Sequence, residues 1–300
     1  MEYNYIERKD YNKVISIKLV VPCGCNANCP FCYNKDKESA DYDVQKFLDN
    51  FIPSLSNLLD KIGNKNPVSL DITGGEPTLD IDLLYLVLIK LNKFHIKDKV
   101  QRVTLTTNGT NLYEIPLNLM RDTIDYVNIS VHDYRPEQRR NIMQINIPEL
   151  AYKRIISRLN SVGITVSASA VIYHTINNFD KWRDEFINWA KRQGFISVRF
   201  RCDVFWNQPH WFDAYMCKTK HEEQFQVITD EWTTDSRWCR LRRDDGMRVF
   251  FLRGVIDTSV LTKGIEYIIH DDGKCYCDFY KKIPIDKYEY EIGKIYDRVN

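Results

Sequence analysis

The chain has 300 residues, of which 44% are hydrophobic and 28% are charged, an ordinary balance for one large globular domain or for a domain with an extension. Its formal net charge is +1, so composition gives no electrostatic argument for a nucleic-acid partner or a membrane surface. No apolar signal segment follows Met1, and the apolar run Leu83–Ile89 is too short to cross a bilayer. We therefore expect a cytoplasmic protein with no membrane partner.

In chain order, apolar and β-branched runs predict six strands. They cover residues 14–21, 67–73, 100–106, 125–131, 164–172 and 195–201. Between them, apolar residues at helical spacing predict helices over residues 43–62, 79–94, 113–121, 148–162 and 178–193, with Pro53 expected to kink the first. Alternating strands and helices predict an α/β fold with a parallel sheet and right-handed crossovers, whose chemistry lies at the carboxyl ends of the strands. The pattern alone does not separate a barrel from an open, doubly wound sheet.

Three cysteines on one short loop after the first predicted strand indicate a metal centre. Cys25, Cys29 and Cys32 have the spacing C-x3-C-x2-C, and no fourth cysteine follows at similar spacing. A [4Fe-4S] cluster held by these three would keep one iron free of protein ligand, where a second molecule can bind. The chain has nine cysteines, and their odd number and clustering argue against a disulfide framework. The loop also lacks the paired Cys/His ligands of a structural zinc site.

The second predicted strand is followed by Gly74-Gly75-Glu76-Pro77, which alone could be a simple turn. Together with the cysteine spacing, however, it resembles the radical S-adenosylmethionine (SAM) enzymes, whose pattern is C-x3-C-x-aromatic-C. Phe31 fills the aromatic position. The resemblance implies a partial (β/α)6 barrel over residues 14–201. It also implies that the open iron chelates SAM and that one electron cleaves SAM to methionine and a 5'-deoxyadenosyl radical, which takes hydrogen from a substrate.

The resemblance also implies which residues bind the cofactor. Gly74, Gly75, Glu76 and Pro77 would contact the SAM amino group, and polar side chains at later strand ends would contact its methionine and ribose. These candidates are Thr107, Asn108, Ser130 and, inside the fifth strand, Ser169. Asn108-Gly109 is also a good turn dipeptide, so a structural interpretation stays open there.

His132 follows Ser130 and is the candidate catalytic residue, because histidine can donate a hydrogen bond or relay a proton. A structural histidine with satisfied hydrogen bonds is the favoured alternative. The neighbouring Arg135, Arg139 and Arg140 are expected to form a solvated helix face with Glu137.

After residue 202 the strand–helix alternation ends, so we divide the chain into a core, residues 1–201, and a small α+β extension, residues 202–300. Strands are expected over residues 249–260, 264–269 and 276–280. The extension is expected to cap the substrate side, using the aromatic residues Trp206, Trp211, Phe212, Tyr215 and Trp238. Arginines crowd one part of it and could form a substrate-closing surface, although Asp244 and Asp245 argue against nucleic-acid binding: Arg237, Arg240, Arg242, Arg243 and Arg248.

Five further cysteines leave open whether the extension holds an auxiliary cluster: Cys202, Cys217, Cys239, Cys275 and Cys277. Their spacing favours buried thiols instead.

The expected activity is hydrogen abstraction from a small-molecule or nucleotide-like substrate, with an electron donor such as a flavodoxin or ferredoxin. Only about thirteen residues precede the first strand, which leaves no room for a fused N-terminal peptide-binding domain. A peptide-modifying maturase is the alternative. A non-catalytic iron–sulfur protein for electron transfer or sensing is the alternative from another class, and the Gly-Gly-Glu-Pro segment argues against it. A zinc-stabilised binding module is a third class.

Overall fold

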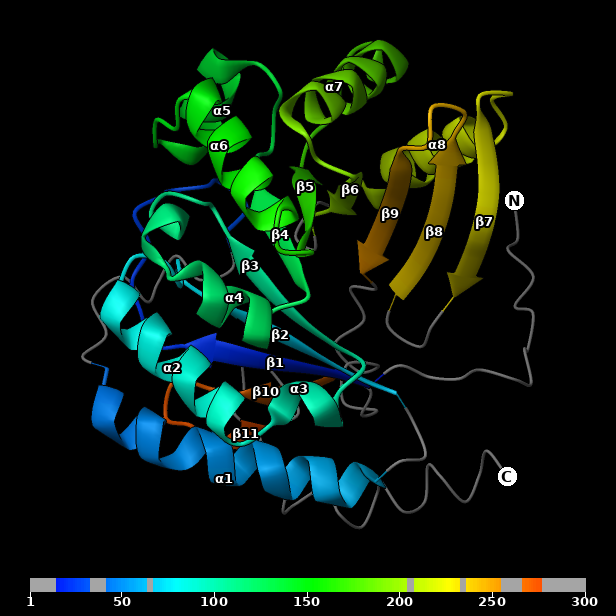
Figure 1. Cartoon of the computed structure of the whole chain (residues 1–300). Coiled ribbons are helices and arrows are strands. Elements are labelled where there is room, and N and C mark those ends of the chain that lie inside the picture. Colours follow the sequence, from blue (N-terminus) through cyan, green and yellow to red (C-terminus); the bar gives the residue numbers. More distant parts are fainter. Residues whose placement is uncertain are drawn as a thin grey trace, which may run out of the picture.

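Six parallel strands form the centre of the fold in the computed structural model, which describes residues 15–32, 42–63, 67–203, 208–232, 236–254 and 266–276 (Figure 1). The strands lie side by side in chain order. They are β1 (Ile15–Val21), β2 (Val68–Gly74), β3 (Arg102–Thr107), β4 (Tyr126–Ser130), β5 (Thr165–Ile172) and β6 (Ser197–Cys202). Each of the six predicted strands is confirmed to within two residues at either end.

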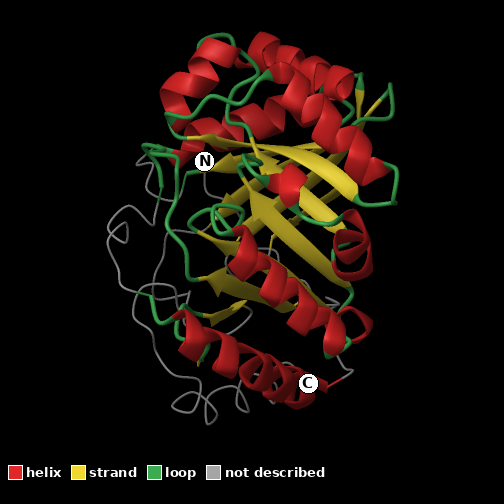
Figure 2. Cartoon of the chain, turned by 60° about the vertical axis from the view of Figure 1, so that its left-hand side comes forward, coloured by secondary structure: helices red, strands yellow, loops and turns green. Residues whose placement is uncertain are grey.

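Helices connect the strands and lie on the outside of the sheet (Figure 2). They are α1 (Val44–Ile62), α2 (Ile81–Lys93), α3 (Ile96–Lys99), the 3-10 helix η3 (Leu112–Glu114), α4 (Leu117–Thr123), α5 (Pro136–Met143), α6 (Glu149–Asn160) and α7 (Phe179–Gln193). Asp43 and Asp80 cap α1 and α2, each accepting a hydrogen bond from a backbone N–H three residues on. Helix α1 continues through Pro53. None of the helices in the described residues has the length and apolar character to cross a membrane.

The two faces of the sheet differ in chemistry. Residues such as Ile17, Leu70 and Phe200 face the helices and are fully buried in the hydrophobic core. The alternate residues form the opposite, inner face and are mostly polar, with Asp71 and Arg199 only partly buried. Asp71 on β2 and Arg199 on β6 interact electrostatically although three strands separate them in the sheet. The sheet therefore curves around its polar face, as an unclosed partial (β/α)6 barrel.

Residues after 202 extend this same sheet at both of its edges. Strand β9 (Arg248–Gly254) pairs in parallel with β6, and β8 (Ser236–Arg243) and β7 (Phe225–Trp232) continue antiparallel from it. At the other edge, β10 (Glu266–Ile269) pairs in parallel with β1, followed by the short β11 (Cys275–Tyr276). The result is one sheet of 11 strands. The strand predicted over residues 249–260 corresponds to β9, that over 264–269 to β10, and that over 276–280 to β11. Residues 255–265 and 277–280 of these predictions lie outside the described residues.

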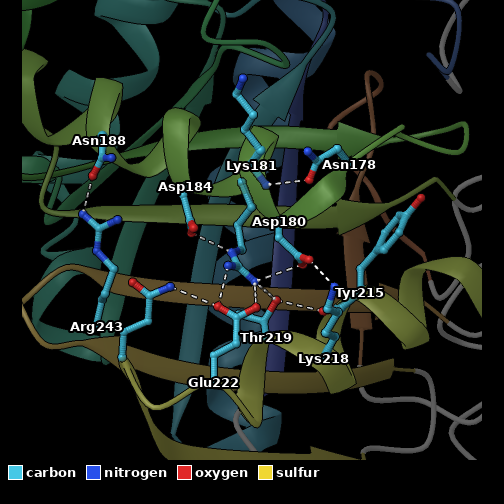
Figure 3. Close-up of polar contacts among 12 residues, drawn as sticks. Asn178, Asp180, Lys181, Asp184, Asn188, Tyr215, Lys218, Thr219, Glu222 and Arg243 are labelled. Atoms are coloured by element: carbon cyan, nitrogen blue, oxygen red, sulfur yellow. Dashed lines mark hydrogen bonds and ion pairs between the residues drawn. The ribbon is translucent and has the colours of Figure 1, made fainter.

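Helix α8 (Pro209–Lys220), which the sequence did not predict, joins the extension to the core. Its contact with α7 centres on Arg183, whose side chain is fully buried. The guanidinium donates to both carboxylate oxygens of Glu222, at 2.9 and 2.7 Å, to Asp184 at 2.9 Å and to Thr219 at 2.8 Å. Figure 3 shows these acceptors converging from α7, α8 and the residues just after α8, with Lys218 paired to Asp180 beside them. A buried, multiply bonded charge of this kind fixes the relative position of the two helices.

Two aromatic residues expected to cap the substrate side are core residues instead. The ring of Tyr215 stacks on Phe179 of α7 with 4.0 Å between centroids, and Phe212 packs edge-on against Phe251 of β9. Both rings are needed to bury the apolar side of α8. Trp211 is 41% exposed, and Trp206 lies outside the described residues. Capping by the extension remains a prediction.

The prediction that Arg139 lies on a solvated helix face is wrong, because this residue is only 2% exposed. Its guanidinium lies over the rings of Tyr152 and Trp189, at 4.9 and 5.3 Å, and donates to Glu149 at 2.5 Å. These contacts join α5 to α6 and α7.

Two of the extension's crowded arginines are likewise buried and paired. Arg237 pairs with Asp230 at 2.8 Å and Arg243 with Asp245 at 2.6 Å. Their contacts hold the β7–β8–β9 strands and turns together, so these two do not belong to a solvated charge run.

Candidate active site at the carboxyl ends of the strands

The cysteine loop begins directly after β1 and is packed against the Gly-Gly-Glu-Pro segment after β2. The backbone N–H of Glu76 donates to the carbonyl of Gly24 at 2.8 Å. A Cβ atom on Gly75 would lie 2.3 Å from that carbonyl oxygen, and one on Gly74 would lie 2.5 Å from the carbonyl oxygen of Val21. Both glycines are therefore required by close backbone approach, which brings the two motifs into direct contact.

Cys23 differs chemically from the three cysteines that follow it. Its thiol is buried and donates to the carbonyls of Glu76, at 3.2 Å, and Val21, at 3.5 Å. Burial, helped by the nearby charge of Glu76, raises the pKa of Cys23 to about 12. A thiol held in its protonated form is a poor metal ligand, so Cys23 serves the packing of the loop.

Cys25, Cys29 and Cys32 are each partly exposed on the same loop. Within the described ranges, no three His, Cys, Asp or Glu side chains converge as ligands of a single metal ion. The ligands of an iron–sulfur cluster need not converge on one ion, because each thiolate binds a different iron of the cluster. Three accessible cysteines beside one protonated cysteine fit a cluster with three protein ligands.

Glu76 joins the loops after β2 and β3. Its side chain is only 2% exposed. Oε1 accepts from the Thr78 backbone N–H at 2.9 Å and from the hydroxyls of Thr78 and Thr107 at 2.7 and 2.5 Å, while Oε2 accepts from the backbone N–H of Asn108 at 2.5 Å. Burial raises the pKa of Glu76, and these four hydrogen bonds oppose that rise by stabilising the carboxylate.

A second set of polar contacts links the cysteine loop to the end of β3. The Asn108 side chain donates to Oδ1 of Asn26 at 2.7 Å and accepts at Oδ1 from the Thr110 hydroxyl at 2.6 Å. Asn26 in turn donates to the Thr110 hydroxyl at 3.1 Å. Asn108 is thus engaged by its own protein, which favours the structural interpretation left open for Asn108-Gly109.

Phe31 brings the cysteine loop against the ends of β4 and β5. Its ring lies 4.7 Å from that of His132 and 4.9 Å from that of Tyr173. His132 is buried, has φ +65° and accepts a hydrogen bond at Nδ1 from the backbone N–H of Val171 at 3.2 Å. Burial, with a smaller contribution from Arg201, lowers the pKa of His132 to about 3. These contacts favour a neutral, structural histidine over a proton relay, and its catalytic role stays a prediction.

Ser130 and Ser169 are paired across β4 and β5 on the inner face, close to the same end of the sheet. Ser130 is partly exposed and Ser169 is buried. Sequence reasoning did not single out Asn26, Thr78, Thr110 or Tyr173. Asn26 and Tyr173 have partners from other loops, whereas Thr78 and Thr110 each follow a side-chain acceptor, Glu76 and Asn108, by two residues, which is a local signal for a side-chain turn.

Comparison with known proteins identifies the family to which the chain belongs. Residues 19–190, more than half of the chain, match the model of the Radical SAM superfamily, so the chain belongs to this family and is a radical SAM enzyme. The cofactors of such enzymes are a [4Fe-4S] cluster and SAM.

Among curated relatives, a probable GTP 3',8-cyclase of Pyrococcus abyssi is 23% identical over 265 residues, which cover 87% of this chain and 79% of that protein. A second, from Pyrobaculum aerophilum, is 30% identical over 168 residues, which cover 54% of this chain and 49% of that protein. The crystal structure of Streptococcus suis SuiB bound to S-adenosylmethionine matches with a TM-score of 0.59 at 12% identity, over 89% of this chain and 61% of SuiB. At that identity, the likeness to SuiB shows the fold alone.

Proposed function

We propose that this protein reductively cleaves SAM and abstracts a hydrogen atom from a small-molecule or nucleotide-like substrate. The observation that carries the proposal is the direct contact of the three-cysteine loop with the Gly-Gly-Glu-Pro segment through Gly24, Gly75 and Glu76. That contact brings the cysteine loop next to the partly exposed Gly74 and Gly75 at the carboxyl ends of β1 and β2, which supports a shared cofactor site. The relatives named probable GTP 3',8-cyclase support a nucleotide-like substrate.

The chain's own residues divide the work of binding. Cys25, Cys29 and Cys32 would hold the cluster, and the carbonyls of Gly74 and Gly75 would accept from the SAM ammonium. When bound, the two cofactors supply an electron from a donor such as a flavodoxin or ferredoxin and the radical made from SAM. Ser130 and Ser169 offer polar contacts on the neighbouring strand ends.

Phe31 and Tyr173 have a separate task, which is to keep water away from the reacting atoms. The Phe31 ring contacts the rings of both His132 and Tyr173, between the cysteine loop and the ends of β4 and β5. A neutral, buried His132 contributes an apolar wall rather than a charge at this place. Water exclusion protects a reactive intermediate from quenching and strengthens the polar contacts with the cofactor.

The test is formation of 5'-deoxyadenosine by protein reconstituted anaerobically with iron and sulfide, given SAM and dithionite. We expect slow formation without substrate, and none in the triple variant Cys25→Ala, Cys29→Ala, Cys32→Ala. Faster formation on addition of nucleoside triphosphates would support the nucleotide-like class, and faster formation with peptides only would favour the maturase alternative. Iron incorporation without any 5'-deoxyadenosine would contradict the proposal.

A further inference from the structure

The inner face of the sheet carries an excess of positive charge. On strands β1 to β6, the residues that alternate with the buried core positions include four cations and a single carboxylate. They are Lys18, Arg102, Arg199, Arg201 and Asp71. The whole chain has a net charge of only +1, so this concentration is local.

Arg102 and Arg199 meet at one tyrosine. The guanidinium of Arg102 lies 5.7 Å, and that of Arg199 lies 4.9 Å, from the ring centroid of Tyr126 on β4. The Tyr126 hydroxyl is fixed by a 2.5 Å hydrogen bond with the Ser197 hydroxyl. The arrangement holds two like charges close to each other on three strands, β3, β4 and β6.

These charges are only partly compensated: Arg199 has a side-chain hydrogen bond with Tyr126 and lies 5.6 Å from the ring centroid of Phe250. The Nε atoms of Arg102 and Arg199 are both buried and have no hydrogen-bond partner among the described residues. Neither guanidinium forms an ion pair with a described carboxylate within 4.0 Å, and Asp71 acts on Arg199 only through its field. Burial, and then the neighbouring Arg102, lower the pKa of Arg199, whereas the fields of Tyr126 and Asp71 and a hydrogen bond with Tyr126 oppose this fall. Removing water from a guanidinium without a close anion is costly, so an anion bound beside Arg102 and Arg199 would be favourable.

The arginines also lead toward the candidate active site. Arg201 lies two residues beyond Arg199 on the same face of β6, is exposed, and acts electrostatically on His132. The charged face therefore runs from Tyr126 to the carboxyl ends of the strands, where His132 contacts Phe31 of the cysteine loop. Arg102 and Arg199 lie toward the amino-terminal ends of β3 and β6, with Arg102 about 16–17 Å along β3 from Thr107. An anionic group bound there would belong to a molecule long enough to reach from this end to the strand ends.

We propose that Arg102 and Arg199, with Arg201 nearer the strand ends, bind an anionic oxygen group of the substrate, a phosphate or a carboxylate. This inference deepens the proposed function and rests on it only in calling the ligand a substrate. Guanidinium groups suit both anions, since their paired N–H donors match two oxygens at once.

Anion binding can be measured without turnover, so its failure is distinguishable from a failure to cleave SAM. Isothermal titration calorimetry with pyrophosphate and with malonate, on reconstituted protein at low salt, should show saturable binding. Tighter binding of pyrophosphate assigns a phosphate, and tighter binding of malonate assigns a carboxylate. Arg199→Gln and Arg102→Gln should each weaken the preferred anion by about tenfold or more, because a charge-assisted hydrogen bond is lost.

The matched control is Arg158→Gln. Arg158 also lies over a tyrosine ring, 4.9 Å from Tyr113, but on the outer side of the fold, so its substitution should leave anion affinity unchanged. If the inner-face variants fail to fold, arginine modification of the wild type by phenylglyoxal gives a second measurement, in which the bound anion should protect Arg199 and Arg201. No binding of either anion, or equal binding by the inner-face variants and wild type, would overturn the proposal.

Discussion

The backbone N–H of Asn108 donates to Oε2 of Glu76 at 2.5 Å, and with the Thr107 hydroxyl on Oε1 this bond joins the end of β3 to the loop after β2. All four hydrogen bonds found on the Glu76 carboxylate come from the chain's own groups. Glu76 therefore acts as a positioning residue, which shapes the backbone that SAM would contact.

Glu76→Gln should lower both stability and SAM affinity. The amide would place an NH2 group against donors that need an acceptor, at a cost of about 2–3 kcal/mol in the free energy of unfolding. Thermal unfolding and equilibrium dialysis with SAM measure the two effects. Glu137→Gln, on the exposed side of α5, is the control. Weaker SAM binding with unchanged stability would contradict the positioning role and favour direct contact of the carboxylate with SAM.

Alanine substitution should distinguish the three proposed cluster ligands from Cys23. Replacing Cys25, Cys29 or Cys32 by Ala should abolish the cluster, whereas Cys23→Ala should retain about four irons per protein, since the Cys23 thiol is buried and donates to the carbonyls of Val21 and Glu76. Iron analysis and the visible absorption of reconstituted protein decide the matter. Loss of the cluster in Cys23→Ala at normal thermal stability would reverse the assignment.

The triple variant Cys25→Ala, Cys29→Ala, Cys32→Ala also tests whether the extension holds an auxiliary cluster. Cys202 and Cys239 are buried, and burial raises the pKa of each to about 12; Cys277 lies outside the described residues. We expect no residual iron in that variant. A remaining cluster that disappears on adding Cys275→Ala and Cys277→Ala would establish an auxiliary-cluster domain instead.

Gly75→Ala should prevent the cysteine loop from packing on the Gly-Gly-Glu-Pro segment. Its Cβ would lie 2.3 Å from the Gly24 carbonyl oxygen and 2.5 Å from that of Cys23, and both neighbours are backbone atoms that cannot rotate away. We expect loss of cluster incorporation and a clear fall in the melting temperature. Gly163→Ala is the control, because nothing lies within 4 Å there and only its positive φ is penalised, by about 1–2 kcal/mol. Equal behaviour of the two variants would refute this account.

His132 should make the protein sensitive to acid. Its pKa is lowered in the fold to about 3, so an unfolded chain binds a proton that the native chain does not. The contribution to stability is full above the ordinary pKa of about 6.5 and is lost as the pH falls from there toward 3. His132→Asn keeps an acceptor for the Val171 N–H and tolerates the positive φ, and it should flatten the pH dependence in this range.

Unfolding by urea between pH 7 and pH 4 measures that difference. The control is His95→Asn, because His95 also has a positive φ but a side chain that is 77% exposed. It should leave the pH profile unchanged. An acid sensitivity that survives in His132→Asn would show that other groups cause it.

The strands and helices of the core could be predicted from the sequence because each is encoded by one contiguous run of residues. Each of the six strands is a short apolar run, and the two site motifs are contiguous segments that directly follow strands. The extension could not be predicted in the same way. In α8 the buried positions 212, 215, 216 and 219 do have helical spacing, but one of them is the polar Thr219 and the apolar Trp211 is exposed, so the apolar pattern in the sequence is weak. Arg139 and Arg183 resemble surface charges until the acids and rings of other elements surround them.

The position of β10 beside β1 determines when, during synthesis, the strand that carries the cysteine loop becomes paired on both sides. Strand β1, which carries the cysteine loop at its end, is hydrogen-bonded to β2 on one side and to Glu266–Ile269 on the other. During synthesis the loop emerges more than two hundred residues before the segment that completes the sheet beside it. A nascent chain therefore exposes its thiols next to an unpaired strand edge, which is open to oxidation and to pairing with other chains. The sheet on both sides of β1 is thus complete only once residues 266–269 have docked.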